Sequence, residues 1–75
     1  MTRQIADIAL SMIQHYSNIN CGWVITNEKI DDDGYFVRME NKERCLLAKY
    51  EARIEDDMLV LYDGIYGDFL NCCKI

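Results

Sequence analysis

Proline is absent from this 75-residue chain, and glycine occurs only four times. A chain without Pro-, Gly- or Ser-rich stretches lacks the composition of linkers and disordered segments. Apolar residues make up 51% of the chain, which is enough to build a core. At this length only about 60% of the surface of the unfolded chain can be buried, so we expect a single small domain over residues 1–75.

Long hydrophobic runs are also missing. The longest uncharged segment, residues 8–27, has the length of a membrane span, but it includes several polar side chains that lipid would leave unsatisfied. A signal peptide is not expected either, because Arg3 is the only cation before an apolar stretch that already contains Asp7. These absences predict a cytoplasmic protein that has no membrane partner.

Catalytic and metal-binding motifs are absent as well. The chain has no Gly-rich phosphate loop, nucleophile elbow or H-E-x-x-H helix, so we expect no enzyme activity and no cofactor. His15 has no recognisable Ser or Cys partner nearby and is interpreted as structural. Cys21, Cys45, Cys72 and Cys73 form no C-x-x-C pair, which disfavours zinc. We interpret them as reduced, partly buried thiols without intramolecular disulfides.

One acidic segment partly matches a calcium-binding loop. Asp31, Asp33 and Gly34 occupy its third, fifth and sixth positions, and Glu40 its twelfth. Lys29 stands at the first position, where a carboxylate should bind the ion, and the residues before it are typical of a strand instead of the required helix. We therefore interpret this segment as an acidic hairpin turn without a metal.

The first element that the pattern predicts is a helix over residues 3–17. Thr2 is expected to cap its first turn. Apolar side chains recur at intervals of three and four residues, which places them along one helix face. They are Ile5, Ile8, Ala9, Met12 and Tyr16. Ala6, Leu10 and Ile13 widen this stripe, so we expect the helix to be heavily buried or to face two surfaces.

Strand-like segments fill the remainder of the chain. Residues 22–30 and 35–40 flank the turn 31–34 and predict a hairpin. Residues 44–55 fit either a helix or an alternating strand, and the strand is favoured because the turn at 55–57 gives it a partner at 58–62. Asp63 and Gly64 predict a two-residue turn into a last strand over 65–74. The expected fold is α+β, with an N-terminal helix packed on an antiparallel meander sheet of four or five strands.

The net charge of −5 lies entirely in residues 28–75, because Arg3 and Asp7 balance in the first part. In a meander, alternate turns share one end of the sheet, which predicts an acidic rim formed by Asp31, Asp32, Asp33, Glu55, Asp56 and Asp57. Turns also favour Asp for conformational reasons, and net charge keeps small proteins soluble. The functional interpretation is that the rim steers the domain toward a basic surface, with aromatic anchors beside it. The candidate anchors are Trp23, Tyr35, Tyr62 and Tyr66.

The expected partner is a protein with a basic surface. Direct nucleic-acid binding is not expected, because the Lys and Arg residues are dispersed among acids. An acidic domain can instead occupy the basic channel of a nucleic-acid-handling protein, where its carboxylates replace phosphates.

In general type, the small size, the acidity and the lack of catalytic residues resemble phage and mobile-element proteins that inhibit host defences, such as anti-CRISPR proteins. This resemblance rests on size and composition, not on aligned residues. It implies a non-enzymatic inhibitor located in the cytoplasm of the host cell. The alternative is a structural, self-assembling homodimer without an inhibitory role, built through an exposed edge strand and an apolar helix face.

Overall fold

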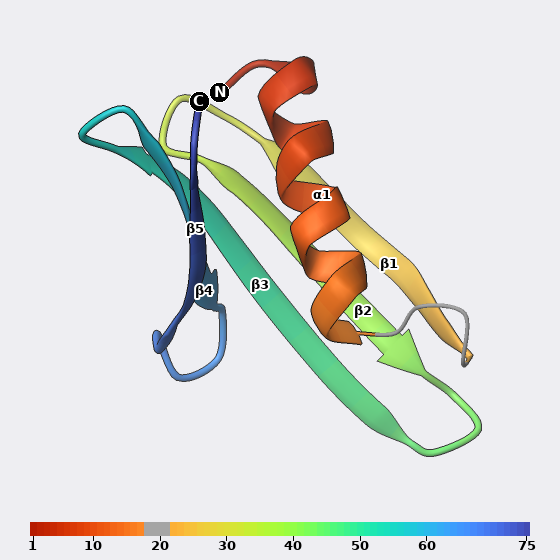
Figure 1. Cartoon of the computed structure of the whole chain (residues 1–75). Helices are drawn as coiled ribbons and strands as arrows, with labels where there is room; N and C mark the ends of the chain where they lie inside the picture. Colours follow the sequence, from red (N-terminus) through yellow and green to blue (C-terminus); the bar gives the residue numbers. More distant parts are fainter. Residues whose placement is uncertain (18–21) are drawn as a thin grey trace.

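The computed structural model describes residues 1–17 and 22–75 and contains one helix and one sheet (Figure 1). The helix is α1 (Arg3–Ser17), and the strands are β1 (Trp23–Ile30), β2 (Tyr35–Asn41), β3 (Leu46–Glu55), β4 (Met58–Asp63) and β5 (Phe69–Lys74). The sheet is antiparallel throughout, in the order β1-β2-β3-β4-β5. The predicted α+β fold, a helix on a meander sheet, is confirmed, with five strands.

Helix α1 begins at the predicted cap. The backbone N–H of Ile5 donates to Oγ1 of Thr2 at 3.3 Å, and the N–H of Ala6 donates to the Thr2 carbonyl at 3.0 Å. These bonds satisfy donors that the first turn of a helix leaves free.

The buried stripe of α1 is narrower than the predicted one. Ala6, Ala9 and Ile13 are fully buried, at the intervals of three and four that align side chains along a helix. Ile8 and Tyr16, which the spacing places on the stripe, are each 44% exposed. Two alanines and one isoleucine therefore form the fully buried side of the helix in the core.

The helix covers one face of the sheet (Figure 1). Successive side chains of a strand point to opposite faces, so only alternate residues reach α1. The core side chains of the sheet follow this rule: Tyr35, Val37, Met39, Ala52, Leu59 and Leu61. We call the other side, which no helix covers, the open face.

The ambiguous segment 44–55 is a strand from Leu46 onward. β3 pairs with β2 from Asn41↔Leu46 to Tyr35↔Ala52, and with β4 on its other side. Because β3 is paired with a strand on each side, its residues form a strand although their individual propensities favour a helix.

The two-residue turn predicted at Asp63 and Gly64 is wrong, because the loop is longer. The loop does not close after two residues, because the N–H of Asp63 donates to the carbonyl of Asp68 at 2.8 Å, and β5 begins only at Phe69. The carboxylate of Asp63 accepts bonds from the N–H groups of Ile65 and Tyr66, which hold the loop in its longer form. Gly67, with φ of 77°, supplies the left-handed residue of this loop.

Candidate protein-binding surface

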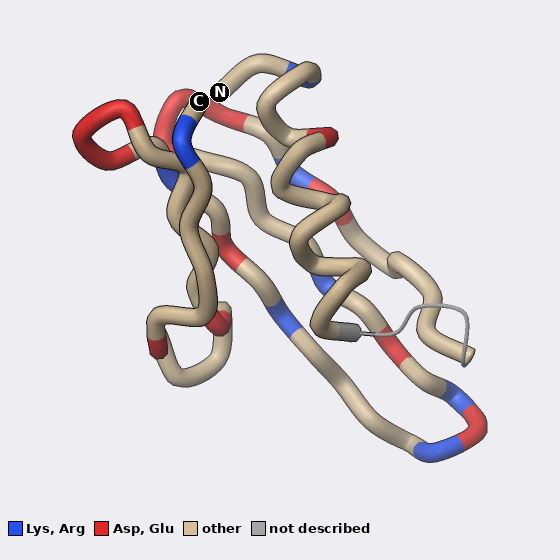
Figure 2. Tube along the Cα trace, viewed as in Figure 1, with Lys and Arg blue, Asp and Glu red and all other residues tan. Residues whose placement is uncertain are grey.

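The structure brings both acidic turns to one end of the sheet. The turns β1–β2 and β3–β4 lie at the end where the two termini are found, and Figure 2 shows acidic residues concentrated there. The turn β2–β3 and the loop β4–β5 occupy the opposite end. The meander therefore places all six residues of the acidic rim at the same end, as expected from the order of the strands.

Asp31, one of the rim residues, stabilises the β1–β2 turn. Its Oδ1 accepts bonds from the N–H groups of Asp33 at 2.8 Å and Gly34 at 3.0 Å, and its Oδ2 lies 3.1 Å from the Lys29 ammonium. The Lys29 contact, followed by the two backbone donors, holds the pKa of Asp31 below its ordinary value. These contacts are those of an acidic hairpin turn, and they leave this carboxylate little capacity for a partner.

The other acidic side chains of the rim differ in whether they already interact with a neighbouring side chain. Glu55 accepts a hydrogen bond from the hydroxyl of Tyr62, and this contact raises the pKa of that tyrosine. Four exposed carboxylates remain that form no ion pair with any described residue. They are Asp32, Asp33, Asp56 and Asp57.

The backbone of the second turn fixes two of these carboxylates. Asp56 and Asp57 have φ values of 50° and 63°, both in the left-handed region. A two-residue hairpin turn with positive φ at both positions matches the twist of the flanking strands. The turn therefore presents two adjacent carboxylates on a short and well-defined loop.

The predicted aromatic anchors do not gather beside the rim. Tyr35 is fully buried in the core, so its interpretation as a surface anchor is wrong. Trp23 is half-buried against the core at the far end of β1, and Tyr66, 79% exposed, lies in the distant β4–β5 loop. Tyr62 does reach the rim, because its hydroxyl donates a hydrogen bond to Glu55.

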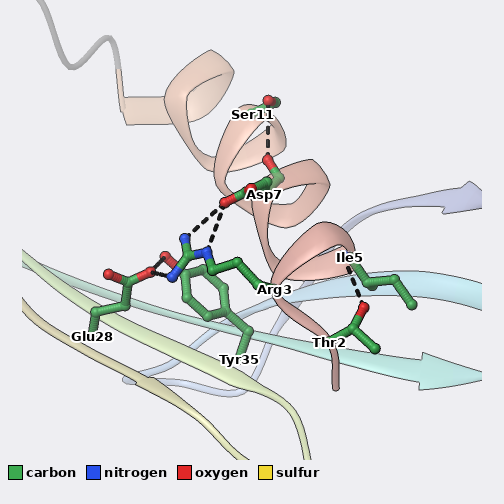
Figure 3. A network of polar contacts seen from close by, with 7 residues as sticks. All are labelled: Thr2, Arg3, Ile5, Asp7, Ser11, Glu28 and Tyr35. Carbon is green, nitrogen blue, oxygen red and sulfur yellow. Dashed lines mark hydrogen bonds and ion pairs between the residues drawn. The ribbon is translucent and has the colours of Figure 1, made fainter.

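A polar network, which sequence reasoning missed, joins the start of α1 to β1 and β2 (Figure 3). The guanidinium of Arg3 lies 2.8 Å from Asp7 on its own helix and 2.7 Å from Glu28 on β1. The hydroxyl of the buried Tyr35 donates to the same Oε1 of Glu28 at 2.8 Å. A helix residue, an edge-strand residue and a core residue thus meet at one carboxylate oxygen.

This network changes the proton affinities of two groups. The hydrogen bond from Tyr35, followed by the contact with Arg3, lowers the pKa of Glu28. Burial, followed by the bond to Glu28, raises the pKa of the Tyr35 hydroxyl. At neutral pH the carboxylate is therefore charged and the phenol neutral, which is the pairing that this hydrogen bond requires.

The open face carries cations that appear scattered in the sequence. Lys29, Arg38, Lys49 and Arg53 are cross-strand neighbours of other open-face residues, and three of them surround a hollow of about 300 Å³. The sequence does contain a signal for this arrangement. Arg38 lies between the core residues Val37 and Met39, so its side chain must point to the opposite face of the sheet.

The cysteines are more exposed than predicted. Cys45, Cys72 and Cys73 are free thiols, and only Cys73 is half-buried, with its Sγ 3.8 Å from the sulfur of Met12. Cys21 lies outside the described residues. His15 is exposed and packs edge-on against the ring of Tyr16.

Within the described part of the chain, no group of three or more His, Cys, Asp or Glu side chains could hold a metal ion. The described residues also contain no helix with the length and apolarity needed to cross a bilayer. Comparisons with protein-family models, with curated proteins and with solved structures find no match to this chain. Its function is therefore inferred from its surface chemistry.

Proposed function

We propose that this protein is a non-enzymatic protein-binding module whose acidic rim docks on a basic surface of a partner protein. The observation that carries the proposal is the set of four exposed carboxylates, on two turns at one end of the sheet, that form no ion pair with a described residue. Concentrated charge of one sign accelerates association with a surface of the opposite sign. Short hairpin turns also favour a high affinity, because they lose little conformational freedom when they bind.

The partner class that fits the rim best is a protein that handles nucleic acid. Such a protein has a basic channel for phosphates, and carboxylates on a narrow sheet end can occupy part of it. The rim consists of two short turns, so it suits a local plug and not the imitation of a long duplex. Binding of this kind would inhibit the partner, as small anti-defence proteins of phages do.

The test compares two matched double variants against a partner captured from lysate. Asp32→Asn with Asp56→Asn removes two charges from the rim while keeping side chains that suit turns. The control, Glu43→Gln with Asp68→Asn, removes the same charge from the opposite end of the sheet. Surface plasmon resonance then gives the association rate of each variant at several salt concentrations.

We expect the rim variant to associate several-fold more slowly at low salt and to show a weaker salt dependence, because charges near an interface act mainly on the association rate. The control variant should retain the association rate of the unmodified protein. Equal association rates for the two folded variants would reject the rim as the docking surface.

The second candidate function is self-assembly, which the exposed apolar side chains at the β5 edge favour. Phe69 is 61% exposed and Ile75 44% exposed. An edge strand offers unpaired backbone groups to a second chain. Sedimentation velocity at increasing concentration distinguishes the two functions, since a species that stays monomeric excludes the homodimer.

A further inference from the structure

Two cations face each other directly across the open face. Arg38 of β2 and Lys49 of β3 are cross-strand partners. Like charges in directly opposed positions destabilise a sheet. Glu40 neutralises part of the charge of Arg38 through an ion pair of 3.5 Å. Lys49 forms no ion pair with any described residue. An anion placed between Arg38 and Lys49 would remove this repulsion.

These two cations border the hollow of about 300 Å³ on the open face. The side chains that matter for its chemistry are Asn27, Lys29, Phe36, Arg38, Lys49 and Glu51. Three of the six are cations and one, Glu51, is a carboxylate. Lys29 is paired with Asp31 at 3.1 Å, Arg38 with Glu40 at 3.5 Å and Glu51 with Arg53 at 2.6 Å, so the charge of Lys49 is the one that no ion pair with a described residue balances. The lining therefore keeps a positive charge in a protein whose net charge is −5.

The hollow also has a flat apolar element. The ring of Phe36 is half-buried beside it, with the Lys29 ammonium 5.8 Å from the ring centroid. Asn27 also lines the hollow, and its Oδ1 accepts a bond from the N–H of Glu28 at 3.0 Å. The N–H of Gly64 donates to the carbonyl of Lys49 at 2.7 Å and so fixes the β4–β5 loop at the border of the hollow.

We propose that this hollow binds a free mononucleotide, with its phosphate between Arg38 and Lys49 and its base against Phe36. A phosphate accepts charge-assisted hydrogen bonds from both cations, and an aromatic ring offers a stacking surface to any base. The volume lies at the lower limit for small-molecule sites, which favours one nucleotide over a dinucleotide. A long polyanion is disfavoured because it would approach the acidic rim. This site lies on the open face and adjoins the rim only through Lys29, whose ammonium lies 3.1 Å from Asp31, and it goes beyond the proposed function.

Isothermal titration calorimetry tests the proposal with adenosine, guanosine, cytidine and uridine 5′-monophosphates as probes. We expect at least one of them to bind with 1:1 stoichiometry, and the matching nucleoside and inorganic phosphate each to bind at least tenfold more weakly. Failure of all four nucleotides to bind at millimolar concentration would overturn the proposal. Phosphate that binds as tightly as the nucleotides, or a single-stranded oligonucleotide that binds more tightly per nucleotide, would also overturn it.

A matched pair of variants locates the site. Lys49→Gln should weaken nucleotide binding roughly tenfold through the loss of one charge-assisted contact. The thermal stability of this variant should not fall, because the substitution also removes the repulsion with Arg38. Lys42→Gln makes the same charge change in the β2–β3 turn and should bind normally. Equal affinities of the two folded variants would contradict the assignment.

Discussion

Removal of one buried hydroxyl tests the network at the start of α1. Tyr35→Phe deletes the donor that lies 2.8 Å from Glu28 and keeps the ring, which is fully buried in the core. Because the ring remains, the packing of α1 against the sheet is preserved and no large cavity forms. The measured loss of stability therefore reports the hydrogen bond itself.

The magnitude follows from the environment of the acceptor. A hydrogen bond to a charged group contributes about 1.5–3 kcal/mol to stability. The side chain of Glu28 is 33% exposed and keeps its contact with Arg3, so water and the guanidinium replace part of what is lost. We expect a loss of about 1–2 kcal/mol, because the carboxylate is not left unsatisfied.

Urea denaturation followed by Trp23 fluorescence measures this loss. With an m value of about 1 kcal/mol/M, the midpoint should fall by about 1–2 M while m stays constant. The control is Tyr66→Phe, which deletes the same atom from a side chain that is 79% exposed and should change stability by less than about 0.5 kcal/mol. Equal losses in both variants would refute the assignment of the effect to the network.

The pH dependence gives an independent check of the same bond. Since the pKa of Glu28 is lowered in the folded protein, its stabilising contribution is present above the unfolded pKa and is lost as the pH falls. The difference in stability between the unmodified protein and Tyr35→Phe should therefore be largest near neutral pH. It should narrow as the pH falls below about 4.3. A difference that is independent of pH from 7 to 3 would contradict the role given to the Tyr35 hydroxyl.

Three further predictions concern turns and thiols. Asp56→Asn with Asp57→Gly should raise stability by roughly 0.5–1 kcal/mol, measured as an increase in Tm, because both residues have positive φ and an Asn-Gly pair favours this turn. Gly34→Ala should lower the free energy of unfolding, measured by chemical denaturation, by more than about 2 kcal/mol, since its Cβ would lie 2.4 Å from the carbonyl oxygen of Ala52. The same change at Gly67 meets no neighbour and should cost only about 1 kcal/mol of backbone strain. All four cysteines should react with an alkylating reagent under denaturing, non-reducing conditions, and a mass that shows fewer than four added groups would contradict the absence of disulfides.

The fold was accessible from local patterns in the sequence. The alternation through Ala48, Tyr50 and Ala52 identified β3 although its residues favour a helix, because the next segment supplied an antiparallel partner. The length of the last turn was not accessible in the same way. Asp63-Gly64 suits a two-residue turn, but the Asp63 carboxylate binds backbone N–H groups further along and extends the loop. Side-chain bonds of this kind are decided by geometry that the residue types alone do not specify.

The error at Tyr35 has a physical explanation in the pattern of β2. Tyr35 and Phe36 are both aromatic, so neither stands out as the core residue. The following residues resolve the ambiguity, because Val37 and Met39 share the face of Tyr35, while Arg38 shares the face of Phe36. An aromatic residue that alternates with Val and Met belongs to the core, and its hydroxyl then requires a hydrogen-bond partner, which Glu28 provides.

The same alternation explains why counting charges along the chain missed the hollow. Arg38 and Lys49 are eleven positions apart and each has a glutamate two positions further along the sequence, yet the hairpin register makes them direct partners. The acids at the turns lie at one end of the sheet, whereas these cations lie in the middle of its open face. A composition that is acidic overall is thus compatible with a positive site, because a meander separates turn residues from strand residues in space. Charges in a β protein must therefore be counted by face and by end before a ligand class is excluded.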